Sequence, residues 1–198
     1  MNSGRKNATL YTAMLNDLLL RTKVTNSDRT EIKLDSGVDN AVNAILDIYN
    51  SDKKTMVIGN GGSAAIASHM QNDLCKAVGV KSLVFNDQPL LTALANDNRY
   101  GSVFEYPINM WAQQNDLLIG ISSSGESENI LRGARTAKER GCRLITFSGF
   151  HMDNQLRKLG DINFYTPSSE CGYVEVVHSA LTHMITDMVI NRKNEHRP

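Results

Sequence analysis

The chain has 198 residues, which is the length of about one domain and is enough to bury a sizeable hydrophobic core. Its 21 Lys and Arg residues balance 21 Asp and Glu residues, and this zero net charge offers no basic field for nucleic acid and no basic surface for a membrane. No apolar run reaches the roughly 18 residues of a transmembrane helix, the N-terminus lacks an apolar signal core, and three widely spaced cysteines indicate reduced thiols, so we expect a cytoplasmic protein.

The first fifty residues contain two stretches with apolar residues at helical spacing, 8–22 and 37–49. Both precede the first expected strand, and together they carry more apolar surface than one sheet can cover. We therefore expect them to cap the domain or to pack against copies of themselves in an oligomer.

Short apolar runs then alternate with helical patterns along the rest of the chain. The expected strands are 55–59, 81–85, 116–121, 143–149 and 162–166. The expected helices are 63–78, 89–95, 103–113, 127–140 and 173–191. The polar segment 96–102 reads as a loop.

This alternation predicts an α/β domain with a mostly parallel sheet. We expect a single domain over 1–198, with a helical oligomerisation segment at 1–50 and an α/β core at 51–198. Ligands of such folds bind beyond the carboxyl ends of the strands. Two turns rich in glycine and serine follow expected strands at that edge, "GNGGSAA" at 59–65 and "GISSSGES" at 120–127.

The second of these turns has the composition of an anion site. A helix N-terminus offers unpaired N–H groups and partial positive charge. Hydroxyls add donors, and Gly125 allows close approach, so the turn can surround a phosphate with four serines, Ser122, Ser123, Ser124 and Ser127. The lysine-containing phosphate loop and the G-x-G-x-x-G pattern are both absent, which disfavours nucleotide hydrolysis and dinucleotide binding. Alternatively, Ser127 only caps the helix and the other serines are turn residues.

The stretches "VIGNGGSAAIASHMQNDL" and "ISSSGESENILRGARTAKERG" resemble the SIS (sugar isomerase) domain family. Within that family they look most like the bacterial phosphoheptose isomerases. The resemblance implies a three-layer, flavodoxin-like αβα fold with a five-stranded parallel sheet, and a homotetramer whose active sites are shared between subunits. It also implies a phosphorylated sugar as substrate, held by the serine turn and by Asn60, Gly61, Gly62, Ser63, Asp97 and Glu175. Asp97 lies in "AND" (95–97), which is otherwise a simple turn signal.

The reaction implied by the resemblance is the interconversion of sedoheptulose 7-phosphate and a heptose 7-phosphate through an enediol, which requires a base and a partner that returns the proton. His69 and Asp73 are four residues apart on one expected helix, and Glu175 and His183 are eight apart on another. The family pattern has histidine, glutamate, glutamine and histidine at these positions. By that match Asp73 is the base and His183 its partner, and the four side chains are candidate zinc ligands, two histidines and two carboxylates.

The sequence departs from the family pattern at several of these positions. Asp73 is one methylene shorter than glutamate, and Glu175 adds a negative charge where the family has glutamine. Ala77 stands in place of an arginine, and Ile66 and Gly172 in place of polar or acidic residues. These differences bear on which sugar is bound more than on the class of reaction.

Three functional classes follow from these observations. The first is a phosphosugar isomerase that feeds nucleotide-sugar synthesis for surface polysaccharides. The second is a non-catalytic SIS protein that binds a phosphosugar or another protein, such as a replication initiator. The third is a phosphosugar-sensing regulatory domain, which ranks last because no basic DNA-binding module precedes residue 50.

Overall fold

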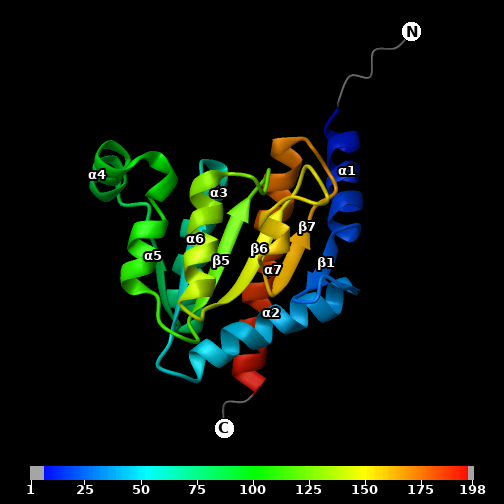
Figure 1. The fold of residues 1–198 in the computed structure, drawn as a ribbon. Helices are drawn as coiled ribbons and strands as arrows, with labels where there is room; N and C mark the ends of the chain where they lie inside the picture. Colours follow the sequence, from blue (N-terminus) through cyan, green and yellow to red (C-terminus); the bar gives the residue numbers. More distant parts are fainter. Residues whose placement is uncertain (1–6, 196–198) are drawn as a thin grey trace.

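The computed structural model describes residues 7–195, which form one mixed sheet covered by helices on both faces (Figure 1). The strand order is β2-β1-β7-β6-β5-β3-β4. The strands are β1 (Lys23–Asn26), β2 (Glu31–Ile32), β3 (Lys54–Gly59), β4 (Lys81–Val84), β5 (Leu117–Ser122), β6 (Arg143–Ser148) and β7 (Ile162–Tyr165). All five expected strands are present, and neighbours among them pair in parallel.

The helices divide into two layers around the sheet. They are α1 (Ala8–Leu20), α2 (Leu34–Tyr49), α3 (Gly62–Asp73), α4 (Gln88–Asn98), α5 (Glu105–Trp111), α6 (Glu128–Glu139) and α7 (Cys171–Glu195), with short helices η1 (Leu74–Val78), η2 (Tyr100–Ser102) and η3 (Leu156–Lys158). One core cluster joins α2, α3 and α7 to the sheet, and the other joins α4, α5 and α6 to its opposite face. The expected three-layer αβα fold is confirmed.

The sheet has seven strands, because two antiparallel strands extend the five expected parallel ones. Residues 23–32 form a hairpin in which β1 pairs antiparallel with β2 and with β7. The N-terminal segment is therefore partly built into the sheet and is not helical throughout. The two strands have only four and two residues at the sheet edge, where few buried apolar side chains are needed, so they leave no apolar run in the sequence.

The apolar face of α2 is covered within the chain, in agreement with the first alternative for segment 37–49, a helix that caps the domain. Its buried side chains are Val38, Ala41, Val42, Ala44, Ile45 and Ile48. Helix α1 differs, because only Leu18 is buried while Leu10, Met14 and Leu20 are 59%, 46% and 70% exposed. The uncovered apolar surface of the N-terminal segment therefore lies on α1.

Two helix predictions need correction at their ends. The expected helix 63–78 changes at Leu74 into the single π-helical turn η1, which ends at Gly79 with φ of 85°. Segment 96–102 is helical and not a loop, because α4 continues through Asp97 and η2 follows.

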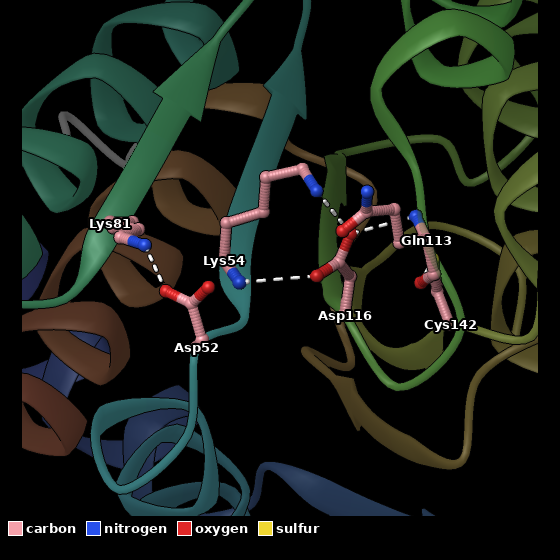
Figure 2. A network of polar contacts seen from close by, with 6 residues as sticks. All are labelled: Asp52, Lys54, Lys81, Gln113, Asp116 and Cys142. Carbon is pink, nitrogen blue, oxygen red and sulfur yellow. Dashed lines mark hydrogen bonds and ion pairs between the residues drawn. The ribbon is translucent and has the colours of Figure 1, made fainter.

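A buried carboxylate, that of Asp116, joins the start of β5 to the start of β3 (Figure 2). Asp116 is completely buried and accepts hydrogen bonds from the backbone N–H groups of Lys54 (3.1 Å) and Gln113 (2.8 Å). The ammonium of Lys54 lies 2.6 Å from the same carboxylate, so the charge is both paired and hydrogen-bonded. Burial, with Asp116 nearby, raises the pKa of the adjacent Cys142 thiol to about 11.

Within residues 7–195, no helix combines the length and the apolar character that crossing a membrane requires.

Candidate active site

The two glycine and serine turns meet at the point where the sheet reverses its order. Strand β3 lies between β4 and β5, and its last residue Gly59 pairs with Ile121 near the end of β5. The two turns therefore start next to each other, at the carboxyl ends of β3 and β5. Crevices of this kind bind the ligands of α/β sheets.

The first turn brings the start of α3 close to the end of β3. Gly59 has no room for a β-carbon, because the backbone of Ser63 and Ala64 occupies that space. Gly61 adopts φ of 52°, which favours glycine. The turn thus depends on its glycines, and it leaves Ser63 buried at the first turn of the helix.

The serine turn is held both internally and from outside. The N–H of Gly125 (φ 66°) donates to the carbonyl oxygen of Ser122 at 3.1 Å and to its hydroxyl at 3.2 Å. The N–H groups of Gly149 and Leu156 donate to the carbonyl oxygens of Ser123 (2.9 Å) and Gly125 (3.0 Å). The turn is therefore a fixed loop at the N-terminus of α6, as an anion site requires.

A cavity of about 230 Å³ lies between the two turns and the start of α7. It is lined by Asn60, Ser63, Ser122, Ser123, Ser124, Ser127, Phe150, Cys171 and Glu175. Seven of these residues were predicted to bind the substrate, and the structure brings these seven together at one cavity. Phe150 and Cys171 are additional, and neither carries a motif that marks it in the sequence.

A pair of amides ties the two turns together. Asn60 and Asn129 exchange hydrogen bonds through their carboxamides, at 2.9 Å and 2.8 Å. Asn129 is buried on the first turn of α6, and the Tyr100 hydroxyl donates to the Asn60 oxygen at 3.2 Å. This pairing fixes Asn60 between the serine cavity and a second hollow of about 320 Å³, which is lined in part by Ala64 and Ser68 of α3.

Three of the four predicted metal ligands form a separate group on α3 and α7. Asp73 Oδ2 lies 3.4 Å from His69 Nε2 and 3.7 Å from His183 Nδ1. The two imidazole rings meet edge to face, with centroids 4.7 Å apart. The side chains of His69 and His183 are 59% and 46% exposed, so the group opens to the surface.

Glu175 lies at the serine cavity and does not join this group. Its carboxylate sits against Gly62, where a β-carbon would overlap it, and its Oε1 is 3.5 Å from the Cys171 sulfur. Glu175 and His183 are eight residues apart on α7, which separates them by about 12 Å along the axis. A single chain therefore presents three of the four predicted ligands together.

The remaining candidates occupy other positions. Asp97 is exposed on the last turn of α4 and is not among the residues that line the serine cavity. Ile66 lies beside the His69 group, while Ala77 is exposed in η1 and Gly172 is exposed at the start of α7. His178 is fully buried, and its Nε2 lies 3.1 Å from the carbonyl oxygen of Ser148 at the end of β6.

The donors of the His69 group fit a zinc ion. Three atoms within 4.8 Å of one another suit a metal whose bonds to nitrogen and oxygen are about 2.0–2.2 Å long. The group borders a hollow of about 10 Å³ between α3 and α7, room for about one water-sized sphere.

Comparison with known proteins gives the family. The model of the SIS domain matches residues 20–149, and the chain belongs to this family. It is similar to the phosphoheptose isomerase of Sulfurimonas denitrificans, with 34% identity over 72% of this chain and 75% of the relative. It is also 34% identical to the phosphoheptose isomerase of a Nitratiruptor species, over 73% of this chain and 80% of that one.

Solved structures agree in fold. The structure of a phosphoheptose isomerase from Neisseria gonorrhoeae has a TM-score of 0.79 at 24% identity, and the match covers 91% of this chain and 95% of the other. A phosphoheptose isomerase from Francisella tularensis also gives 0.79, at 20% identity over 92% and 96% of the two chains. The chain is thus a SIS-domain protein related to phosphoheptose isomerases.

Proposed function

We propose that the chain is an aldose–ketose isomerase of a sugar phosphate. The proposed substrate is sedoheptulose 7-phosphate, converted to a heptose 7-phosphate for the nucleotide sugars of surface polysaccharides. The observation that carries the proposal is the cavity in which both turns converge at the N-terminus of α6. Its serine hydroxyls and the helix N-terminus suit a phosphate, and Asn60 and Glu175 suit the hydroxyls of an open-chain sugar.

The proton transfers of the proposed reaction fall to the His69 group. Asp73 is the candidate base that removes the proton beside the carbonyl, and His183 is the candidate that moves a proton at the neighbouring carbon. Their contact lets either one orient the other. Zinc held by His69, Asp73 and His183 would supply polarisation of the carbonyl and enediol oxygens.

The separation of the two regions supports a site shared between subunits. Glu175, at the serine cavity, and His183 are about 12 Å apart along α7, and Ser63 and Asp73 are about 15 Å apart along α3. An extended seven-carbon sugar phosphate spans roughly 10 Å from its first carbon to phosphorus. We therefore propose that the exposed His69 group of one subunit faces the serine cavity of another in a homotetramer, where the second subunit's Glu175 supplies the fourth ligand.

The test is isomerisation itself. The purified protein is incubated in D₂O with a panel of ketose and aldose phosphates, and NMR follows both interconversion and deuterium entry at the carbon beside the carbonyl. The proposal predicts turnover and exchange with a seven-carbon ketose 7-phosphate, both lost in His183→Ala. Binding of phosphosugars without exchange at any carbon would leave the alternative, a non-catalytic phosphosugar-binding or protein-binding SIS tetramer.

A further inference from the structure

Phe150 has a backbone conformation that bulky residues rarely adopt. Its φ is 57°, a positive value like those of the glycines Gly61 (52°) and Gly125 (66°) in the two turns. Two hydrogen bonds impose this conformation. The N–H of Phe150 donates to the carbonyl oxygen of Ser168 at 2.8 Å, and the hydroxyl of Tyr165 donates to the carbonyl oxygen of Phe150 at 2.9 Å.

The hydrophobic core gives no reason for an aromatic side chain at this position. Phe150 is half-buried and belongs to neither of the two core clusters. Glycine would satisfy the same two backbone hydrogen bonds with less strain. A strained conformation kept by a bulky residue outside the core points to a role of the side chain itself.

Phe150 forms part of the wall of the serine cavity. It follows Gly149, whose N–H is bonded to Ser123 and which has no room for a β-carbon between Ser123 and Val174. Of the residues that line the cavity, only Phe150 has a large apolar side chain. The cavity therefore has a hydroxyl-rich side suited to a phosphate and one aromatic surface suited to carbon.

We propose that Phe150 determines specificity by packing its ring against the carbon chain of the phosphosugar whose phosphate occupies the serine turn. The contact distinguishes organic phosphates from inorganic phosphate, because only the former bring C–H groups to the ring. This inference rests on the proposed function, since it assumes that the serine turn holds the phosphate.

The test compares two probes in three proteins. Binding of inorganic phosphate and of sedoheptulose 7-phosphate is measured by calorimetry or by NMR titration for the native protein, Phe150→Gly and Arg29→Gly. Arg29 is the matched control, because it also has a positive φ (63°) but lies in the turn between β1 and β2. Both variants relieve strain, so both should keep or raise the melting temperature.

We expect Phe150→Gly to weaken binding of the sugar phosphate about tenfold and to leave the affinity for inorganic phosphate unchanged. Arg29→Gly should change neither affinity. Phe150→Leu, which keeps apolar bulk, should fall between native protein and Phe150→Gly. An equal loss of affinity for both probes would mean that Phe150 only shapes the serine turn. No loss of affinity for either probe would mean that Phe150 does not contact the ligand. Either result would overturn the inference. If the native protein binds neither probe, the serine turn is not the anion site of the proposed function, and the inference about Phe150 is rejected with it.

Discussion

The carboxylate of Glu175 lies against the backbone of Gly62, in the space that a β-carbon on residue 62 would fill. This contact joins the first residue of α3 to the second turn of α7, and it holds a negative charge beside a helix N-terminus, where it is favoured. The absence of a side chain at Gly62 thus sets the position of an acidic group in the serine cavity.

Gly62→Ala should displace Glu175 and lower kcat/KM for the phosphosugar by roughly tenfold or more, since small displacements of positioned groups are costly. Folding should be little affected, because alanine favours the helix that begins there. Gly172→Ala is the matched control, because a β-carbon on Gly172 would meet only the Tyr11 hydroxyl, at 3.9 Å. Steady-state kinetics and thermal unfolding of both variants make the measurement; equal activity in the two would contradict the role of this contact.

The serine turn makes a second prediction, about the phosphate. Replacing Ser122 and Ser124 by alanine alters two residues that line the cavity and should weaken phosphosugar binding by roughly 30- to 1,000-fold, at about 1–2 kcal/mol for each lost charge-assisted bond. The melting temperature should change little, because the backbone bonds from Gly149 and Leu156 still hold the turn. Ser168→Ala, outside the cavity lining, serves as control in the same titration. Unchanged affinity of the double variant for the phosphosugar would show that the serine turn does not bind the phosphate.

A third prediction concerns the His69 group. Asp73→Asn and His183→Ala should each lower turnover by roughly 10²–10⁴-fold as losses of proton-transfer groups. Chelation should remove bound zinc and activity together, added zinc should restore both, and His69→Ala should bind less zinc by elemental analysis. His151→Ala is the control for an exposed histidine elsewhere. Full activity after complete removal of metal would restrict the group to acid–base chemistry.

The sequence predicts the parts of this protein whose burial leaves a local pattern. The central strands are recognisable because they are buried on both faces and read as continuous apolar runs, as in Leu117–Ser122. The hairpin at 23–32 is not, because its short strands lie at the sheet edge. The serine turn is found from composition, since a helix N-terminus with hydroxyls is a local device.

The arrangement of the site depends on tertiary packing, and sequence spacing cannot give it. The spacing of Glu175 and His183 on one helix implies an axial separation of about 12 Å, but it does not show that Glu175 packs against Gly62 while His183 lies beside Asp73. Phe150 and Cys171 carry no motif and reach the cavity only through the turns that precede them. Asn129 likewise has no signal of its own, because its partner Asn60 is 69 residues away.

Assembly gives the fourth prediction. The exposed apolar side chains of α1 should be covered in the proposed homotetramer, so light scattering should give four times the chain mass of 21.9 kDa. Leu10→Glu combined with Met14→Glu should lower this mass, and turnover should fall with it if the site is shared. Met110→Glu, which charges another exposed apolar position, on α5, is the control. A stable native monomer at micromolar concentration would count against both the tetramer and the shared site.

The last prediction concerns pH and the fully buried imidazole of His178. Its Nε2 lies 3.1 Å from the carbonyl oxygen of Ser148, which can only accept, so Nε2 carries the proton of the neutral ring. Among the described residues no partner bonds to Nδ1. Burial lowers the pKa of His178 from 6.5 to about 4, against the smaller opposing effect of the bond to Ser148.

Between about pH 4 and pH 6.5, the unfolded chain binds a proton at His178 that the folded protein does not. The free energy of unfolding should therefore be at its full value above about pH 6.5 and should fall by about 3 kcal/mol as the pH decreases toward 4. Chemical denaturation between pH 4 and 7 measures this dependence, and His178→Gln, which cannot take up the proton, should flatten it. Parallel curves for the native protein and His178→Gln would show that the buried imidazole is not the group that titrates, because no other difference between the two proteins changes the protons bound in this range.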